Sequence, residues 1–382
     1  MDKTSKKKRS EFMVTRLDPS TGSSDDVYHL QALLGRYGYL TGMYLPGSYD
    51  EATRQAVAQL QSFYRLYPEE DGVCDEATIT LLNQPRCGVP DPSPAHRSPT
   101  GRLSPFVTVG AKWEKNPLSY RILNATPDLP ADRQRAILRE AFSRWSAVCA
   151  LVFREAQGNE APDLSLAFHR GSHGDGEAFD DRGGPDGNTL AHAFFPPPRG
   201  GPWAGSLHFD EFEMWKDQPG GDGIRLYNVT LHEIGHLLGL AHSQDPQAIM
   251  YAYYGEDRND LKADDIAGIQ ALYGAPVTAP VAVSPGQRVS GYLPQTNAEV
   301  RYQVTLQNKL LIRLDGPSGQ DFDLYARYGS PVDLQADQYD AVSYGVTADE
   351  LVTLDKPRAG TYYILVHSYR GAGSYTMEVE VV

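Results

Sequence analysis

Apolar residues near the start of the chain are spaced as on amphipathic helices. In two stretches they recur at steps of three and four residues, the period of an α-helix: Val27, Leu30, Leu33 and Leu34, then Ala52, Ala56, Leu60 and Phe63. The run Asp75-Glu76-Ala77-Thr78 is typical of the start of a third short helix. We expect a small three-helix domain over residues 26–84, after a disordered polar and basic tail at residues 1–25.

The middle of the chain follows a different pattern. Residues 85–104 contain five prolines, which neither continue a helix nor fit a central strand, so we interpret this segment as an extended, cleavable linker. Residues 105–274 combine strand-like runs at 118–123 and 164–168 with an amphipathic helix at 131–148, whose apolar face carries Ile137, Ala141, Trp145 and Val148. This mixture predicts an α+β domain.

The last third of the chain changes to a period of two. After a proline-bearing linker at residues 275–284, apolar residues alternate with polar ones, and Gly and Asp clusters separate the runs: Val300, Tyr302, Val304 and Leu306, then Tyr375, Met377, Val379 and Val381. Such alternation is typical of strands with one buried face. We expect an antiparallel β-sandwich over residues 285–382.

Composition limits the classes of function. The 382 residues carry a formal net charge of −14, whereas a phosphate-binding surface normally needs an excess of Lys and Arg, so we expect no nucleic-acid partner. Apolar runs stay short of the roughly 18 residues that span a bilayer, so no membrane span is expected. The first thirty residues lack the apolar core of about 7 to 15 residues of a secretory signal. Of three cysteines, Cys74, Cys87 and Cys149, at least one has no partner within the chain.

One short segment carries the strongest chemical signal. His232 and His236 are four residues apart, so on a helix both imidazoles leave the same face, close enough to bind one metal ion. Gly239 can adopt the positive φ that ends a helix, and the chain can then return to bring in His242 as a third ligand. Three neutral histidines leave one position on Zn²⁺ for a water with a pKa of about 7, whose proton Glu233 can accept. The spacing predicts zinc-dependent peptide hydrolysis.

The sequence around these residues resembles a known family. The run HEIGHLLGLAHS at residues 232–243, followed by AIMY at 248–251 and DDIAGIQALYG at 264–274, resembles the catalytic domain of the matrix metalloproteinases, the matrixin branch of the metzincin clan. The resemblance covers almost all of residues 105–274 and implies a metzincin fold with a mixed, twisted sheet and helices. It also implies that Met250 forms a Met-turn beneath the zinc and that Tyr254 lies in the main specificity pocket. Ala252 stands where proline is usual in the family, which leaves the shape of that pocket open.

A second set of possible metal ligands precedes this segment. His173, Asp175, His192 and His208 offer three imidazoles and one carboxylate, a closed set typical of structural zinc. Their local sequences, RGSHGDGEAFD, LAHAF and LHFDEFEMW, resemble the structural zinc and calcium loops of the same family. The resemblance implies zinc at these four residues and Ca²⁺, with backbone carbonyls, at Asp180, Asp210 and Glu213. A solvated Asp/Gly loop is the alternative to calcium, and the stretch at 181–187 is longer than the family's usual loop.

A candidate latch lies at the start of the segment at residues 85–104. PRCGVPD at residues 85–91 resembles the cysteine-switch motif of matrix metalloproteinase propeptides at all seven positions. A thiolate is a strong zinc ligand, so Cys87 lying across the cleft could fill the open position on the metal. Gly88 would permit a close backbone approach, and Arg86 could pair with Asp91 to hold the loop. The resemblance implies a zymogen that an activating protease releases by cutting within residues 92–105.

Both flanking domains also resemble known modules. Residues 26–83 resemble the family's propeptide domain, which is related to peptidoglycan-binding modules. This domain either only positions Cys87, which we favour, or also anchors the protein to a cell wall. Residues 285–382 resemble bacterial pre-peptidase C-terminal domains, through DFDLY at 321–325 and GTYYILV at 360–366. Asp321 and Asp323 in that domain are either calcium ligands or solvated acids.

These resemblances imply a secreted, extracellular zinc metalloendopeptidase, made as a latent zymogen, with Glu233 as its general base. The expected cofactors are one catalytic Zn²⁺, one structural Zn²⁺ and Ca²⁺. The expected partners are a protein or peptide substrate, an activating protease and, through the accessory domains, a cell-wall or matrix polymer. Two alternatives stay open: a wall- or matrix-binding protein whose protease domain is vestigial, and a peptidase that acts on cell-wall peptides.

Overall fold

The computed structural model describes residues 14, 16–91, 107–179, 188–276, 280–293, 298–306, 310–332, 334, 337–354 and 358–381. The chain groups into two compact units. The first comprises Met1–Lys112, Ile122–Gln134 and Ser165–Gly268, and the second comprises Trp113–Arg121, Arg135–Leu164 and Ile269–Val382. The N-terminal helices, Cys87 and the candidate zinc-binding histidines therefore share the first unit.

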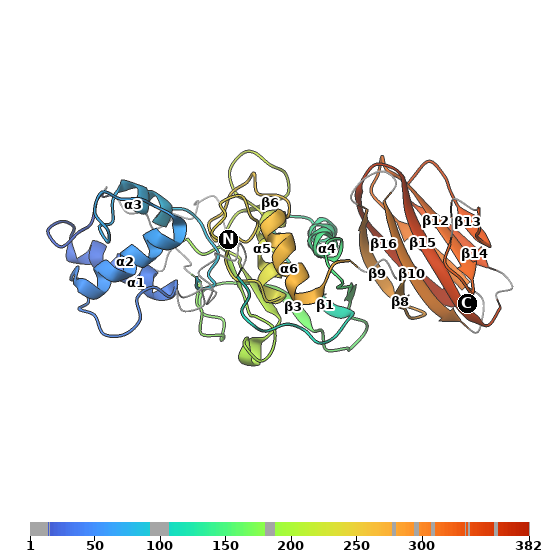
Figure 1. Ribbon diagram of the computed structural model, residues 1–382, viewed down its shortest axis with the longest axis horizontal. Coiled ribbons are helices and arrows are strands. Elements are labelled where there is room, and N and C mark those ends of the chain that lie inside the picture. The colour runs from blue at the N-terminus through green and yellow to red at the C-terminus, as the bar shows by residue number, and fades with distance from the viewer. Residues whose placement is uncertain are drawn as a thin grey trace. The chain divides into compact units, whose positions relative to one another are not determined.

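Three helices lie within residues 16–91: α1 (Ser24–Arg36), α2 (Glu51–Tyr64) and α3 (Glu76–Leu82) (Figure 1). Each follows a residue whose side chain accepts a hydrogen bond from a backbone N–H of the first turn: Ser23, Asp50 and Asp75. These caps satisfy donors that the helix itself leaves open. Local hydrogen bonds therefore set where the three helices begin.

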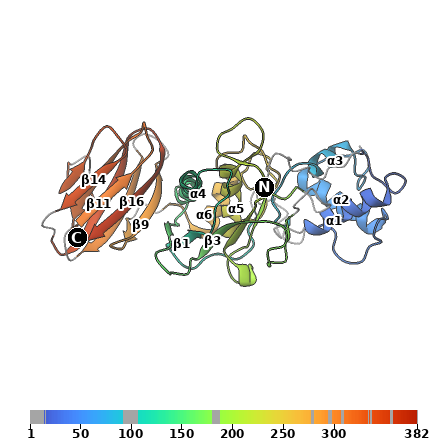
Figure 2. The ribbon, with the colours of Figure 1, turned by 180° about the vertical axis from the view of Figure 1, so that it is seen from behind.

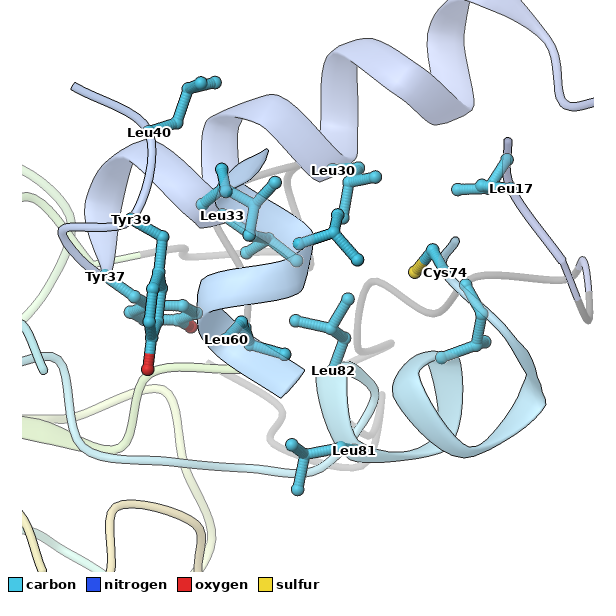
Figure 3. Packing of buried hydrophobic residues seen from close by; sticks show 14 of the residues in the cluster. Leu17, Leu30, Leu33, Tyr37, Tyr39, Leu40, Leu60, Cys74, Leu81 and Leu82 are labelled. Atoms are coloured by element: carbon cyan, nitrogen blue, oxygen red, sulfur yellow. The ribbon is translucent and has the colours of Figure 1, made fainter. Parts of the chain in front are cut away.

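The helices enclose one apolar cluster (Figure 3). Leu30 and Leu33 from α1 point toward Leu60 from α2 and Leu82 from α3. All four side chains are buried, which removes their surface from water and stabilises the group by roughly 1.5–3 kcal/mol per leucine. The same cluster extends to Ala252 and Tyr253. The helical domain and the segment after the candidate catalytic helix therefore share one core.

Part of the segment at residues 1–25 that the sequence assigns to a disordered tail is folded in the structure. Leu17 is fully buried, and its backbone exchanges hydrogen bonds of 2.8 and 2.9 Å with Cys74. Figure 3 shows the two side chains close together beside the helices. A lone leucine in a polar stretch gave no periodic signal, so the pairing with residue 74 could not be predicted.

The middle of the first unit holds short strands and one buried helix. Its elements are most of β3 (Leu164–His169), then β4 (Ala191–Ala193), the 3-10 turn η2 (Gly201–Trp203), β5 (Ser206–Asp210), β6 (Trp215–Lys216), β7 (Ile224–Arg225) and α5 (Leu226–Leu237). β3 pairs with β5 in parallel, whereas β4 pairs with β5 antiparallel and sets His192 opposite His208. The expected mixture of strand directions and helices is confirmed.

The second unit begins with β1 (Leu118–Ile122), most of α4 (Ala131–Ser146) and β2 (Phe153–Glu155), and it includes the end of α6 (Ala263–Tyr273). β1 and β2 pair in parallel. The apolar face expected for the 131–148 helix is buried at Ile137, Ala141 and Trp145, while Val148 lies past the helix end and is half-buried.

The C-terminal residues form two groups of strands: β8 (Val281–Val283), β9 (Arg288–Leu293), β10 (Glu299–Leu306), β11 (Leu310–Asp315), β12 (Asp321–Tyr328), β13 (Ala341–Ser343), β14 (Glu350–Leu354), β15 (Gly360–Arg370) and β16 (Gly373–Val381). Figure 1 shows the order β8, β10, β15, β12, β13, and Figure 2 shows β14, β11, β16, β9. Side chains from both groups share one buried cluster. Strand β8 lies within residues 275–284, which the sequence assigns to a linker, and it pairs in parallel with β10.

Among the described helices, none is both long and apolar enough to cross a membrane.

Candidate active site

The predicted metal-binding histidines lie on and just after helix α5. His232 and His236 are one helical turn apart, and both are buried. The helix ends at Leu237, and Gly239 adopts a φ of 100°, which residues with a side chain rarely reach. The chain turns back at this point and brings His242 beside the helix. The Nε2 atoms of His236 and His242 are 3.1 Å apart.

Cys87 joins this group from a distant part of the sequence. Cys87, His232, His236 and His242 each offer one ligand atom, and these four atoms lie within 4.8 Å of one another. All four residues are buried. The structure thus brings the three predicted zinc ligands and the predicted latch cysteine to one point.

Hydrogen bonds fix the orientation of each imidazole. Each Nδ1 donates at 2.7 Å: His232 to Ile249 O, His236 to Leu240 O and His242 to the Asp91 carboxylate. Because a neutral imidazole carries a single N–H, the Nε2 lone pairs are left for a metal ion. Burial lowers the pKa of all three histidines, which favours the neutral form that binds metal. These donors fit Zn²⁺.

Glu233 lies next to His232 on α5 and is fully buried. Within the described part of the chain, neither oxygen of its carboxylate has a hydrogen-bond partner. Burial raises the pKa of Glu233 to about 8, and the neighbouring Cys87 thiol opposes that rise. A carboxylate with open oxygens beside the histidine cluster is suited to accept a proton.

Residues 85–88 lie as an extended strand between two backbone edges. Arg86 is bridged to Thr189 in parallel on one side and to Tyr253 antiparallel on the other. Five backbone hydrogen bonds of 2.7–2.9 Å hold the strand: Arg86 N to Asn188 O, Leu190 N to Arg86 O, Cys87 N to Ala252 O, Gly88 N to Ala191 O and Tyr254 N to Pro85 O. The groove therefore has the donors and acceptors that bind an extended peptide.

Arg86 and Asp91 form a buried ion pair beside this strand. Two guanidinium nitrogens lie 3.0 and 3.1 Å from the two carboxylate oxygens. The guanidinium also lies over the rings of Tyr37 and Tyr253, 3.7 and 4.9 Å from their centroids. Burial alone would raise the pKa of Asp91, but Arg86 and His242 hold it below its usual value. The pair was predicted from the sequence, whereas the contact of Asp91 with His242 was not.

Met250 belongs to a turn that supports the histidines. The backbone N–H groups of Ile249 and Met250 donate to the Asp265 carboxylate at 2.9 and 3.0 Å. Ile249 O in turn accepts the hydrogen bond from His232. Burial raises the pKa of Asp265 to about 6. The turn that carries Met250 therefore fixes one predicted zinc ligand through its backbone.

A pocket adjoins His232 and Glu233. Tyr254, the residue predicted for a specificity pocket, lines it together with Ala252. Sequence reasoning missed two polar residues of its wall, Asn228 and Arg258. The Arg258 guanidinium donates to the carbonyl oxygens of Pro246 and Tyr253. Neither position follows a pattern that would have marked it.

A second group of ligand atoms lies at β4 and β5. Four residues each offer one ligand atom here, and these atoms lie within 4.8 Å of one another: His173, Asp175, His192 and His208. One oxygen of Asp175 lies 2.7–2.8 Å from a ring nitrogen of each of the three histidines. Burial lowers the pKa of His208 to about 4, so its ring stays neutral. Four converging donors of this kind fit a closed zinc site.

The expected calcium residues are described only in part. Asp210 and Glu213 are buried in one turn, where Glu213 N donates to Asp210 O at 3.2 Å. The predicted ligand Asp180, the loop at 181–187 and the cleavage segment at 92–105 lie outside the described residues.

Comparison with known proteins agrees with this geometry. The matrixin family model matches residues 112–274, which include both histidine clusters and Glu233. The chain contains a matrixin domain. Residues 23–82 match a family of candidate peptidoglycan binding domains, and residues 301–368 match the bacterial pre-peptidase C-terminal domain.

The relatives of the matrixin domain are animal proteases. The chain is 36% identical over 276 residues to matrix metalloproteinase-16 from Mus musculus, covering 69% of this chain and 44% of that protein. It is 42% identical over 227 residues to macrophage metalloelastase from Oryctolagus cuniculus, which covers 58% of this chain and 44% of that protein. For interstitial collagenase from Equus caballus the identity is 40% over 266 residues, covering 67% and 51%. The chain thus spans about half the length of the curated relatives it matches.

Proposed function

We propose that this chain is a zinc-dependent endopeptidase that residues 16–91 keep latent. The observation that carries the proposal is the buried group of Cys87, His232, His236 and His242, three imidazoles and one thiol. The matrixin domain and its protease relatives support it. The substrate is the backbone of a protein or peptide, cut at internal bonds.

The catalytic roles follow from the arrangement on α5. His232, His236 and His242 would hold zinc, which when bound would supply a Lewis acid for the peptide carbonyl and for the attacking water. Glu233 accepts one proton from the attacking water as the oxygen of that water bonds to the carbonyl carbon. The same carboxyl returns that proton to the amine as the C–N bond breaks. The reaction consumes one water and forms no bond between substrate and protein.

Latency follows from what now occupies the groove. Cys87 supplies a fourth ligand where the reaction needs an open position, and residues 85–88 use the backbone edges at 188–191 and 252–254 that a substrate would use. Cleavage by an activating protease within residues 92–105 would separate this strand from the domain that it blocks.

The close passage of Gly88 gives a test of the latch. A Cβ at residue 88 would lie 2.7 Å from Thr189 Cγ2 and 3.3 Å from Ala191 O. Gly88→Ala is therefore expected to weaken docking of the strand by about 1–3 kcal/mol, and the uncut chain should gain peptidase activity roughly 5- to 150-fold. Gly35→Ala, where a Cβ meets nothing closer than 3.9 Å, is the matched control. Equal, unchanged activity of both variants would argue against a latch at Gly88.

The remaining metal sites have supporting roles in this proposal. His173, Asp175, His192 and His208 would hold a structural zinc that ties the loop at 171–179 to β4 and β5. Asp180, Asp210 and Glu213 would bind Ca²⁺ with backbone carbonyls. Tyr254 and the other pocket residues would select a substrate side chain next to the cut bond.

The accessory domains bear on where the enzyme acts. We infer that the two C-terminal groups of strands pack as a β-sandwich, because they share one buried core. The match of residues 23–82 to peptidoglycan binding domains favours a second candidate function, hydrolysis of cell-wall peptides. We propose an extracellular site of action on the basis of the family resemblance.

The proposal is tested by cutting the wild-type chain within residues 92–105 with a trace of protease that is then inhibited. Gelatin hydrolysis should rise after the cut, fall on addition of a zinc chelator and return with added Zn²⁺. Purified peptidoglycan assayed in parallel decides between the two substrates. A cut protein that binds zinc and hydrolyses neither would favour the vestigial alternative.

A further inference from the structure

The three histidines of the catalytic cluster differ in what holds them. His232 and His236 donate from Nδ1 to backbone carbonyls of the matrixin domain itself, Ile249 O and Leu240 O. His242 donates instead, at 2.7 Å, to the carboxylate of Asp91, which lies just before the cleavage segment at 92–105. The side chains of His242 and Asp91 are both fully buried. One of the three predicted zinc ligands is therefore oriented by the segment that activation removes.

The Asp91 carboxylate is held firmly on its other sides. Its Oδ1 also accepts from Arg86 at 3.0 Å, and its Oδ2 accepts from Arg86, Tyr39 and Tyr64 at 2.7–3.1 Å. Tyr39 and Tyr64 belong to the apolar cluster of the helical domain. The position of the carboxylate is thus set by that domain, and His242 meets an acceptor that is already in place.

A carboxylate behind a metal-binding histidine strengthens the metal site. It fixes the ring orientation and the tautomer, and it makes the other nitrogen more basic. Loss of such a partner typically lowers metal affinity by about 10- to 100-fold. The effect is separate from that of the Cys87 thiol, because Asp91 touches His242 and is not itself one of the four grouped ligands.

We propose that the N-terminal domain has a second function besides blocking the active site: through Asp91 it retains the catalytic zinc. This proposal rests on the assignment of His242 as a zinc ligand. Activation then removes both the thiol and the carboxylate, and the processed enzyme holds zinc less tightly than the intact chain. By linkage, bound zinc strengthens docking of residues 85–91 by the same factor by which docking strengthens zinc binding.

The test measures zinc loss from the uncut chain to an excess of a chelating dye. All variants carry Cys87→Ala, so that the sulfur ligand makes no contribution. The variants compared are Cys87→Ala alone, Cys87→Ala/Asp91→Asn and Cys87→Ala/Asp25→Asn, where the exposed Asp25 is a matched control for the loss of a carboxylate in the same domain. The dye reports two zinc ions per chain if both clusters are loaded. The signal of the catalytic zinc is the part that is missing when the same measurement is made on a His236→Ala chain.

Asp91→Asn is expected to speed loss of the catalytic zinc about 10-fold or more, while Asp25→Asn keeps the parent rate. Hydrogen exchange at the Gly88 amide, which donates to Ala191 O, shows whether the strand stays docked. Unchanged zinc loss in Asp91→Asn would overturn the proposal. If Asp91→Asn releases the strand, a further variant, Cys87→Ala/Arg86→Lys, is compared with it, because Arg86→Lys loosens the same strand and keeps the carboxylate. Faster zinc loss from the Asp91 variant than from the Arg86 variant supports the proposal. Equal zinc loss from the two variants overturns it.

Failure here is distinguishable from failure of the proposed function. A chain that binds no zinc at the histidine cluster contradicts both proposals. A cut chain that hydrolyses gelatin, together with Asp91→Asn that retains zinc like its parent, contradicts only the role of Asp91.

Discussion

Glu233→Gln is expected to lower kcat/KM of the cut enzyme for a peptide substrate by about 10²- to 10⁴-fold. The amide has nearly the shape of the carboxylate, but it cannot accept the proton of the attacking water. Because Glu233 is no metal ligand in this account, zinc content should stay at the wild-type level. Peptide hydrolysis and zinc content measured on the same preparation check both statements.

A matched variant separates loss of the base from general damage. Glu114 is an exposed glutamate, and Glu114→Gln removes a carboxylate of the same kind away from the histidines. That variant should hydrolyse peptide at the wild-type rate. If Glu233→Gln kept wild-type activity with zinc bound, another group would have to accept the proton, and the assigned mechanism would be wrong.

Cys87→Ala is expected to give the uncut chain peptidase activity. Removal of the thiol opens the fourth position of the histidine site. If the contact of the thiol with the metal stabilises the closed latch by only about 1.4 kcal/mol, its loss raises the open fraction of the chain about tenfold. We expect a gain of about tenfold or more that still stays below the rate of the cut enzyme. The backbone bonds of residues 86–88 and the Arg86–Asp91 pair remain in this variant and keep part of the groove occupied.

Cys149→Ala is the matched control for that gain. Cys149 is also buried. Its Sγ lies 3.3 Å from the backbone oxygen of Trp145, a residue of helix α4, which carries no predicted metal ligand. Its replacement should leave the uncut chain as inactive as wild type. Absence of any gain in Cys87→Ala would remove the thiol from the account of latency.

Local spacing allowed much of the site to be predicted. His232, Glu233 and His236 lie within two turns of one helix, so their relative positions follow from the helical period. His242 follows because Gly239 permits a sharp return of the chain. Met250 and Cys87 were accessible only through family resemblance, since a single methionine or cysteine has no periodic signature. Helices α1, α2 and α4 and strands β10 and β16 were likewise visible in the repeat of apolar positions.

Contacts between distant segments could not be predicted in this way. Asp91 meets His242 because the helical domain is docked on the matrixin domain, and nothing in either local sequence encodes that approach. The same holds for Tyr39 and Tyr64, which lie in the apolar cluster of the helical domain and also donate to Asp91. Leu17 and strand β8 were missed because short apolar runs next to polar or proline-rich stretches resemble linkers.

The most direct test of the central claim compares two uncut chains in one assay of peptide hydrolysis, Cys87→Ala and Cys87→Ala/Glu233→Gln, both loaded with zinc. Latent zinc catalysis predicts that the first hydrolyses the substrate without any cut in residues 92–105 and that the second is at least about 10²-fold slower. Equal rates from the two chains, whether both active or both inactive, would contradict it.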